Sequence, residues 1–188
     1  LSDYAKGCLS DNVLQAIIGT ARDMGLPVIV DPKSADFSRY SGATMIKPNL
    51  KELALATGMP CGTDAEVLDA ATEALAHANA DAILVTRSQA GMTLVMRAPS
   101  GEGIEAHHFP ARALEVFDVS GAGDTVLATL GLAIAAGADL PQAAAIANAA
   151  AGLVVAKIGT AVVYPGELTH ALHAADVNKA DQKICIKA

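Results

Sequence analysis

Short apolar blocks and amphipathic stretches alternate along the chain from residue 11 to residue 157. Asp11 to Met24 places its apolar residues on one helical stripe and is followed by Gly25, which predicts a helix and its end. The next block, Pro27 to Asp31, has an apolar centre and is too short for a helix, so it predicts a buried strand. Four further segments have a strand pattern, at residues 44–48, 81–86, 91–97 and 103–109.

Helix boundaries are also visible in the sequence. Thr63-Asp-Ala-Glu66 has the pattern of a capping box, in which the threonine oxygen and the glutamate side chain satisfy amides of the first turn, and this helix is predicted to reach about Ala78. Asp139 is the expected cap of a helix that runs from Pro141 to about Lys157. Further helices are predicted at residues 48–57 and 121–136, and a short one begins near residue 165.

This order of elements predicts an α/β fold. Strands separated by helices imply right-handed crossovers, and therefore a doubly wound, mostly parallel sheet with helices on both faces, in three layers. The segments at 91–97 and 103–109 are close enough in sequence to form an antiparallel edge. In open sheets of this kind, ligands bind beyond the carboxyl ends of the strands.

Polar candidates follow the predicted strands at that edge. Any one of them has an ordinary explanation as a cap or loop residue, but four such groups at four strand ends favour an enzyme. They are Asp31 and Lys33 after 27–31, Asn49 and Glu52 after 44–48, Thr86 and Ser88 after 81–86, and a glycine segment after the strand-like Leu114-Glu-Val-Phe117.

The glycine segment, Asp118-Val-Ser-Gly-Ala-Gly-Asp-Thr125, opens a long apolar helical run. Unpaired amides and the positive end of the helix dipole at such a start favour an anion, and Gly121 and Gly123 let it approach the backbone. Asp124 in the first turn is placed to accept a proton from an attacking hydroxyl. The alternative is that Asp124 only satisfies helix-start amides and that the glycines only make a turn.

Composition narrows the function classes. The net charge is −7, without a long basic run, which makes nucleic acid an unexpected partner. No apolar block approaches the ~20 residues that a membrane span needs, so we expect a soluble protein without a membrane partner. The cysteines, which are odd in number and far apart, fit a cytoplasmic location. The 188 residues suit one domain or most of one, and because the chain begins with Leu1, we expect an N-terminal portion to precede it.

The cysteines and histidines do not indicate a metal site. The three cysteines, at positions 8, 61 and 185, are far apart and odd in number, which fits reduced thiols. His107 and His108 are adjacent, so on a strand they point to opposite faces, and the sequence suggests no third ligand for a shared metal.

With these pieces placed, Asp118 to Thr125 resembles the C-terminal signature of the ribokinase-like (PfkB) carbohydrate kinases. Asn49-Leu-Lys-Glu52 is similar to that family's N-x-x-E motif. Thr86-Arg-Ser-Gln-Ala-Gly91 is similar to its nucleotide-binding loop, and Asn148 to its adenine-side asparagine. Four matches in the family's order, over nearly the whole chain, are far more specific than one. They imply a ribokinase-like fold that is N-terminally incomplete, with residues 1–188 as the C-terminal, nucleotide-binding portion of one kinase domain.

Within that family the chain is most similar to the heptose-7-phosphate kinase half of bacterial ADP-heptose synthases. The strings that carry this narrower resemblance are Leu1-Ser-Asp-Tyr-Ala-Lys-Gly7, Val30-Asp-Pro-Lys33, Asp36-Phe-Ser-Arg-Tyr40, Leu84-Val-Thr-Arg-Ser88 with Gly91-Met92, and Glu115-Val-Phe-Asp118. The resemblance implies phosphorylation of D-glycero-D-manno-heptose 7-phosphate at the anomeric position, a step toward the lipopolysaccharide core.

The family resemblance also implies roles for single residues. Asp124 is the catalytic base, and the backbone of Gly121, Ala122 and Gly123 is the anion hole that holds the transferring phosphoryl group. Asn49 and Glu52 organise the hydration shell of Mg²⁺, although an ordinary helix start would use the same residues. The nucleotide, ATP, is bound by Asn49, Thr86, Arg87, Ser88, Gly91 and Asn148.

Two weaker assignments complete the predicted site. Asp118 and Ser120 resemble positions that bind an activating monovalent cation, K⁺, in some relatives, with serine here in place of the commoner threonine. Lys6 and Lys33, near predicted strand ends, are candidates for the substrate's 7-phosphate, because lysine is a common phosphate ligand. The small residues from Ala149 to Gly152 leave room for a planar base, or serve only tight helix packing.

Two alternatives stay open. The first is another kinase of this superfamily, acting on fructose, ribose or a nucleoside. The second is an inactive truncated module for nucleotide binding or assembly. A dinucleotide-binding oxidoreductase is disfavoured, since no G-x-G-x-x-G follows a first strand with an acidic residue ~20 positions on. We expect no nucleotidyltransferase half in this chain, and a homodimer is one expected assembly.

Overall fold

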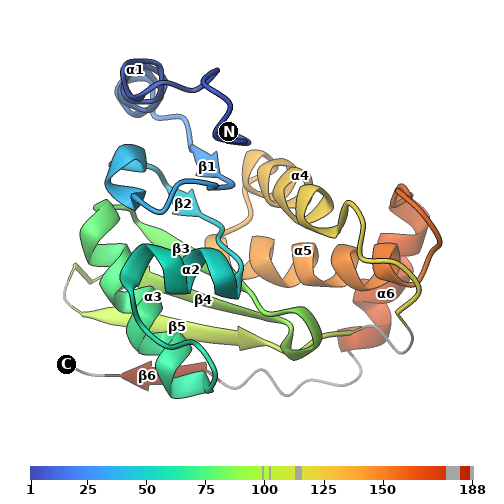
Figure 1. Cartoon of the computed structure of the whole chain (residues 1–188). Helices are drawn as coiled ribbons and strands as arrows, with labels where there is room; N and C mark the ends of the chain where they lie inside the picture. Colours follow the sequence, from blue (N-terminus) through green and yellow to red (C-terminus); the bar gives the residue numbers. More distant parts are fainter. Residues whose placement is uncertain (99, 102, 113–115, 177–182, 187–188) are drawn as a thin grey trace. The chain divides into compact units, whose positions relative to one another are not determined.

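The computed structural model describes the chain except for residues 99, 102, 113–115, 177–182 and 187–188 (Figure 1). The chain folds as two compact units. The first comprises Leu1–Arg87, Thr93–His107 and a segment beginning at Lys183, and the second comprises Ser88–Met92 and His108–Gln182.

A six-stranded sheet forms the framework of the first unit, with its strands in sequence order. They are β1 (Ile29–Val30), β2 (Met45–Ile46), β3 (Ala82–Thr86), β4 (Met92–Arg97), β5 (Ile104–Phe109) and β6 (Lys183–Ile186). β1 pairs with β2 and β2 with β3 in parallel, as the sequence predicts, whereas β6 pairs antiparallel with β5. A six-residue connection joins the neighbours β4 and β5, and only an antiparallel pair can be joined so closely.

β1 and β2 are shorter than their predicted ranges of 27–31 and 44–48. Pro48 has no amide hydrogen, so it interrupts the ladder after β2. Pairing resumes at Asn49, which forms an isolated parallel bridge with Thr86. Asp31, next to β1, bridges to Ser2 in the same way. The predicted strand directions are therefore correct, but the continuous hydrogen-bonded runs are brief.

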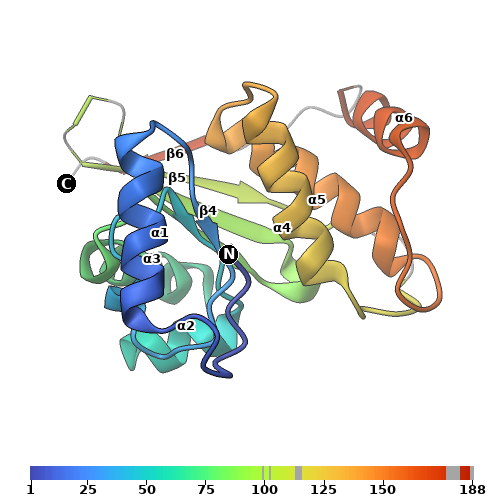
Figure 2. The ribbon, with the colours of Figure 1, turned by 90° about the horizontal axis from the view of Figure 1, so that it is seen from above.

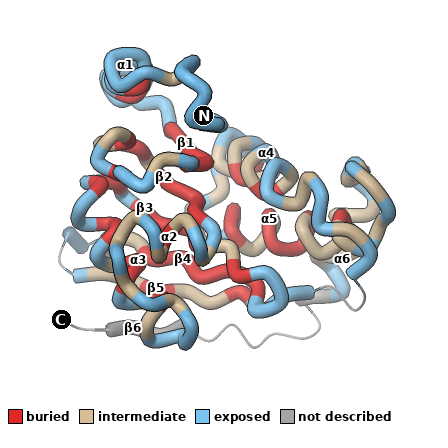
Figure 3. The backbone as a smooth tube through the Cα atoms, viewed as in Figure 1, coloured by how far each residue is buried: buried red, intermediate tan, exposed pale blue. Residues whose placement is uncertain are grey.

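Three helices belong to the first unit: α1 (Asp11–Asp23), α2 (Leu50–Thr57) and α3 (Asp64–Ala78). The capping box predicted at Thr63 and Glu66 is present, and Gly58 ends α2 in the left-handed conformation. α2 and α3 contact each other and β3, and apolar side chains along these elements form the buried core (Figure 3). The core members on α3 are Val67, Ala70, Ala71, Ala74, Leu75 and Ala78.

A short 3₁₀ helix, Phe37–Tyr40, lies between β1 and β2, where sequence analysis predicts neither a helix nor a strand. Asp36 caps it, since its carboxylate accepts a hydrogen bond from the Ser38 amide at 2.9 Å. Phe37 and Tyr40 are fully buried and are three residues apart, so one turn places both rings in the core. β6 and a second short 3₁₀ helix, Ser88–Ala90, are described elements that sequence analysis also did not predict.

The second unit is built on α4 (Ala122–Ala135), α5 (Leu140–Val155) and α6 (Pro165–Asp176). α5 contacts both α4 and α6, and Figure 2 shows α4 and α5 side by side. Asp139 and Gln142 form a capping box at the start of α5, which confirms the predicted cap. Several alanines on α5 are buried, and their small side chains permit close packing around this helix: Ala143, Ala144, Ala147, Ala149 and Ala150.

The predicted strand at 114–117 is wrong for its last two residues, and 114–115 lie outside the described residues. Val116 and Phe117 are exposed and are not in a strand. The amide of Phe117 instead donates to the carbonyl of Val155 at 2.8 Å, so this backbone pairs with the end of α5. In the described part of the chain, no helix combines the length and the apolar character needed to cross a membrane.

Candidate active site

The predicted polar groups of the first unit gather at one edge of its sheet. Because β1, β2 and β3 are parallel, Asp31, Asn49 and Thr86 all follow the carboxyl ends of neighbouring strands. The amide of Thr86 donates to the carbonyl of Pro48 at 2.9 Å, which holds two of these strand ends together. The expectation that these groups meet at one edge is therefore confirmed for the first unit.

A buried ion pair that sequence analysis missed lies at the same edge. Nζ of Lys47 is 3.2 Å from Oδ1 of Asp31, and the Lys47 side chain is only 4% exposed. Buried charges are retained when they are paired, and breaking such a pair leaves an uncompensated charge. The signal in the sequence was a lysine at the end of an apolar strand. Such a lysine is buried together with the strand, and a buried ammonium group requires a carboxylate partner.

Asn49 and Glu52 form a complete capping box at the start of α2. The Glu52 amide donates to Oδ1 of Asn49, and the Asn49 amide donates to Oε2 of Glu52, both at 2.9 Å. The other carboxylate oxygen of Glu52 is paired with Nζ of Lys33. That hydrogen bond raises the pKa of Lys33 above its ordinary value, with the partly opposing effect of burial. Lys33 is thus tied to Glu52, and its predicted role toward a phosphate stays a prediction.

The donor set around Glu52 fits Mg²⁺ only through water. Each carboxylate oxygen of Glu52 already accepts one hydrogen bond, which leaves lone pairs for ordered water. Among the described residues no group of three or more His, Cys, Asp and Glu side chains forms a direct cage. Mg²⁺ commonly keeps several waters and takes few protein ligands, so Asn49 and Glu52 match an outer-sphere site.

Arg87 points its side chain into the first unit. The guanidinium is buried, donates to Oγ1 of Thr93 at 3.0 Å and pairs with Asp64 at the start of α3. It therefore fastens the end of β3 to β4 and α3. A nucleotide role for Arg87 stays a prediction, and the side chain would have to leave these partners to fulfil it.

The glycine segment of the second unit forms the start of α4. Gly121 is the N-cap, with φ of 78°, and it has no side chain that could cap the helix. The amide of Ala122 donates to the carbonyl of Val119 at 3.2 Å, and the amide of Thr125 donates to that of Gly121 at 2.9 Å. The amides of Gly123 and Asp124 take no part in these backbone hydrogen bonds, and no side chain caps the helix.

Three other helix starts differ in this respect. α2, α3 and α5 each begin with a reciprocal capping box. α1 also lacks a side-chain cap bond, but its N-cap residue is Ser10, which carries a hydroxyl. Only glycine stands at the start of α4, and Asp124 is exposed in its first turn. Helix-start amides without a side-chain cap, next to an exposed carboxylate, are suited to binding an anion beside a base.

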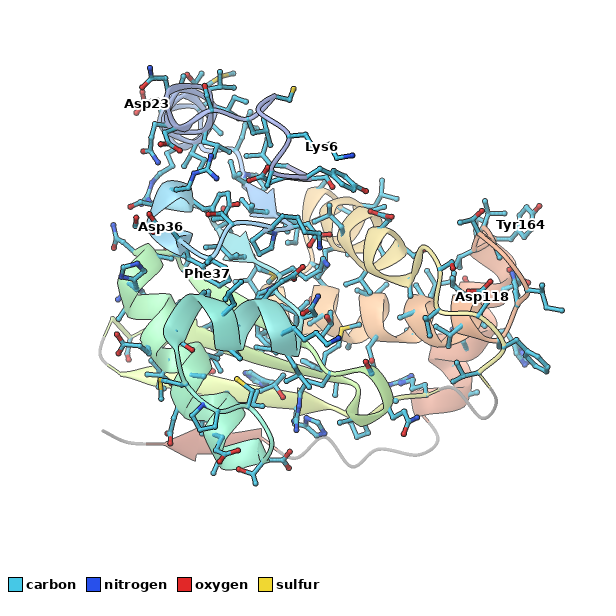
Figure 4. All side chains as sticks on the ribbon, viewed as in Figure 1. Lys6, Asp23, Asp36, Phe37, Asp118 and Tyr164 are labelled. Carbon is cyan, nitrogen blue, oxygen red and sulfur yellow. The ribbon has the colours of Figure 1, made fainter. Side chains whose placement is uncertain are left out.

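Asp118 holds the segment that leads into α4 (Figure 4). One carboxylate oxygen accepts the amide of Ser120 at 2.8 Å, and the other accepts the amide of Gly159 at 3.1 Å. These hydrogen bonds, that of the Ser120 amide first, lower the pKa of Asp118. The carboxylate therefore links the start of α4 to the segment after α5. The predicted K⁺ role of Asp118 and Ser120 stays a prediction.

The charge on Asp118 makes the stability of this unit depend on pH. Because its folded-state pKa lies below the ordinary value of 3.8, Asp118 stabilises the fold above that pH, and the effect disappears as pH falls through the folded pKa. We expect Asp118→Asn to lower the melting temperature near about pH 6, and the difference from wild type to shrink as pH falls below 3.8. Thermal unfolding of both proteins across this range measures the difference. A constant difference at all pH values would contradict the charge-based explanation.

Asn148 and Gly91 meet at the residues that follow β5. The Asn148 side chain is buried and donates from Nδ2 to the carbonyl of Pro110 at 2.8 Å. Gly91, with φ of 83°, lies so close to this segment that a Cβ atom would be 2.0 Å from the carbonyl oxygen of Phe109. The amide of Gly91 donates to the carbonyl of Ser88 at 3.0 Å, and Ser88 itself has φ of 51°.

The predicted nucleotide residues Ser88, Gly91 and Asn148 therefore share one part of the second unit. The side-chain NH₂ group of Asn148 already donates to the carbonyl of Pro110, so its contact with an adenine ring stays a prediction. The backbone of the turn at residues 88–91 is held in a conformation that few residues other than glycine adopt. Such a rigid turn is suited to presenting backbone groups to a ligand.

The first unit has a mixed α/β sheet with polar groups at the carboxyl ends of its parallel strands. The second unit has a glycine helix start with an exposed carboxylate, and both features are those expected of a ribokinase-like phosphotransferase. The model of the pfkB family carbohydrate kinases matches residues 4–165. The chain therefore belongs to the pfkB family of carbohydrate kinases, which are sugar phosphotransferases.

Known proteins support this assignment. The chain is 52% identical to the bifunctional protein HldE of Rhodospirillum rubrum, over 98% of this chain and 36% of that protein. It is 56% identical to the bifunctional protein HldE of Caulobacter sp., over 98% of this chain and 37% of that protein. The chain thus spans little more than a third of the length of these relatives.

Solved structures confirm the predicted α/β, ribokinase-like fold. Ribokinase of Arabidopsis thaliana, solved with ribose and ATP, is 25% identical with a TM-score of 0.76, over 87% of this chain and 53% of that chain. Phosphofructokinase-2 of Escherichia coli, solved with potassium, is 20% identical with a TM-score of 0.76, over 89% of this chain and 53% of that chain.

Proposed function

We propose that this chain is the nucleotide-binding part of a kinase that phosphorylates D-glycero-β-D-manno-heptose 7-phosphate. The γ-phosphate of ATP is transferred to the anomeric hydroxyl, which gives the 1,7-bisphosphate for ADP-heptose and the lipopolysaccharide core. The observation that carries the phosphotransfer is the start of α4, where Gly121 replaces a capping side chain and Asp124 is exposed. The reaction belongs in the cytoplasm, where ATP is available.

In the proposed mechanism Asp124 accepts the proton of the anomeric hydroxyl as its oxygen attacks the γ-phosphorus. The new bond joins that oxygen to phosphorus, the bond to the β-phosphate oxygen breaks, and ADP leaves. The amides of Gly121, Ala122 and Gly123 stabilise the charge on the transferring group, as phosphoryl transfer depends chiefly on positioning and electrostatics. The Ala122 amide would first have to leave the carbonyl of Val119.

Mg²⁺, when bound, neutralises charge on the phosphates of ATP. Asn49 and Glu52 would hold its hydration shell, and Lys33 keeps Glu52 oriented. The backbone of Thr86, Ser88 and Gly91 would line the nucleotide. K⁺ at Asp118 and Ser120 would add positive charge near the start of α4.

The acceptor is inferred from a narrower resemblance than the phosphotransfer. The strings 1–7 and 36–40 resemble heptose-7-phosphate kinases, and identities of 52% and 56% to bifunctional HldE proteins support the same choice. Two structural contacts join these strings: the Tyr40 hydroxyl donates to Oδ2 of Asp3 at 2.6 Å, and Arg39 lies beside the same carboxylate.

A panel of acceptors tests the proposal directly. ADP release by this chain is measured with heptose 7-phosphate, free heptose, fructose, ribose and a nucleoside. Transfer to heptose 7-phosphate with the lowest KM supports the proposal. Preference for an unphosphorylated sugar would indicate another kinase of the family, and ATP binding without transfer would indicate a binding module.

Lys6 is the candidate ligand of the substrate's 7-phosphate, so its replacement should change KM for the sugar phosphate. It is exposed on the segment after the Ser2 bridge, as Figure 4 shows. We expect Lys6→Ala to raise KM for heptose 7-phosphate about tenfold, because a charge-assisted hydrogen bond is lost. KM for ATP should not change. Steady-state kinetics with each substrate varied measures both, and the exposed Lys51→Ala serves as the matched control. An equal rise for Lys51→Ala would contradict a specific contact.

A further inference from the structure

Residues 4–8 form an exposed loop between two anchored positions, and we refer to this segment as loop 4–8. Tyr4 is 59% exposed, and the backbone has positive φ at Ala5 (52°) and Gly7 (85°). A non-glycine residue with positive φ is uncommon and persists where the surroundings hold it. Because loop 4–8 buries none of its own side chains, contacts from residues outside the loop must hold this backbone conformation.

The start of loop 4–8 is fixed by Asp3. Its side chain is 3% exposed, and one oxygen accepts the hydroxyl of Tyr40 at 2.6 Å. The other oxygen accepts the amide of Ala5 at 2.8 Å, which holds the loop in its first turn. The amide of Asp3 donates to the carbonyl of Asp31 at 3.0 Å, so this anchor also connects to the carboxyl end of β1.

The end of loop 4–8 is fixed by Arg39. Its Nη2 donates to the carbonyl of Leu9 at 3.0 Å, and its Nε pairs with the carboxylate of Asp11 at the start of α1. The same guanidinium has Nη1 3.6 Å from Oδ2 of Asp3 and lies 6.0 Å from the centre of the Tyr40 ring. One planar group thus contacts residues on both sides of the loop.

Loop 4–8 follows a strand segment that runs parallel to β1, so it leaves the sheet at its ligand-binding edge. Tyr4 is near enough to Lys33 to contribute to the raised pKa of that lysine, for which the hydrogen bond to Glu52 is the largest cause. Loop 4–8 therefore shares this edge with Lys33, and it carries Lys6.

We propose that Arg39 is a positioning residue that clamps both ends of loop 4–8 and so sets the place of Lys6 for the substrate's phosphate. The inference rests on the proposed function for the identity of the ligand, but the clamp rests on the contacts of Arg39 alone. Arginine is required because its planar fork serves several acceptors at once, whereas a lysine is a single point charge.

The test uses hydrogen exchange of the full chain, followed by mass spectrometry of the peptides that span residues 1–13, and steady-state kinetics. We expect Arg39→Gln to accelerate exchange in loop 4–8 about tenfold, since hydrogen bonds to a charged group are lost. KM for heptose 7-phosphate should rise about fivefold, with KM for ATP unchanged. Arg39→Lys should behave like Arg39→Gln.

Arg22→Lys is the matched control. Arg22 also donates to a carbonyl in the first unit, that of Gly42 at 3.2 Å, but does not contact loop 4–8. Both exchange in the loop and KM should stay at wild-type values in this variant. If Arg39→Gln unfolds the chain, Arg39→Lys carries the test, because it keeps the charge and most of the side-chain volume.

The outcomes separate the clamp from the proposed function. Unchanged exchange in loop 4–8 in folded Arg39 variants would overturn the clamp, and so would full rescue by lysine. Faster exchange with an unchanged KM for the sugar phosphate would overturn the link from the clamp to the substrate. If exchange is faster in the Arg39 variants but the wild-type chain does not phosphorylate heptose 7-phosphate, the proposed acceptor is overturned and the clamp remains supported.

Discussion

Replacing Asp124 with asparagine is expected to lower kcat by about 10²–10⁴-fold, the usual cost of removing a general base. The amide is nearly isosteric with the carboxylate but cannot take the proton of the attacking hydroxyl. Asp124 is exposed in the first turn of α4, so the change should not disturb a packed core. KM for ATP should stay within a few-fold of wild type, because the anion-binding amides remain. The measurement is steady-state kinetics with ATP and heptose 7-phosphate each varied in turn.

The control for charge alone is Asp69→Asn, an exposed carboxylate on α3. This variant should keep wild-type kcat. Asp124→Glu provides a second comparison, because it restores a carboxylate at a displaced position and should recover part of the lost rate. A kcat for Asp124→Asn within a few-fold of wild type would falsify the assignment of Asp124 as the base.

Gly91→Ala is expected to destabilise the chain by about 3 kcal/mol or more, from overpacking together with a left-handed backbone at a non-glycine residue. An added Cβ would lie 2.0 Å from the carbonyl oxygen of Phe109 and 2.6 Å from the amide nitrogen of Ala111. Both obstacles are backbone atoms, so no side-chain rotation relieves the clash. Urea unfolding followed by circular dichroism measures the change in the free energy of unfolding.

Gly58→Ala separates the two contributions. Gly58 ends α2 with φ of 68°, and its Cβ would meet no atom within 4 Å. Its replacement should therefore cost only the conformational part, about 1 kcal/mol. Equal losses for Gly91→Ala and Gly58→Ala would show that the close approach at residues 109–111 contributes nothing.

Local chemistry explains why several elements were predictable. The capping boxes at Thr63 and Asp139 involve residues three positions apart, so their pairing is decided within one helical turn. The start of α4 is equally local, because Gly121 removes a side-chain cap wherever the helix is placed. The strand at 114–117 was mispredicted at its end, since the amide of Phe117 pairs with Val155, 38 positions later in the chain, and no local pattern reports that partner.

The same division holds for the candidate site. Asn49 and Glu52 could be identified from their spacing, but the pairing of Glu52 with Lys33 required the loop after β1 to meet the start of α2. The buried pair of Lys47 and Asp31 likewise depends on the parallel register of β1 and β2. Sequence patterns reveal which residues can serve a site, whereas contacts between strands decide which of them are already engaged.

By itself the sequence determined the alternation of strands and helices, the capped helix starts, and the glycine start with Asp124, because each depends on neighbours within a few residues. Only the tertiary structure decided that Arg39 contacts both sides of loop 4–8 and that Gly91 lies against residues 109–111. Those contacts join segments about 20 to 40 positions apart, and their formation is driven by burial of the shared core rather than by any local preference.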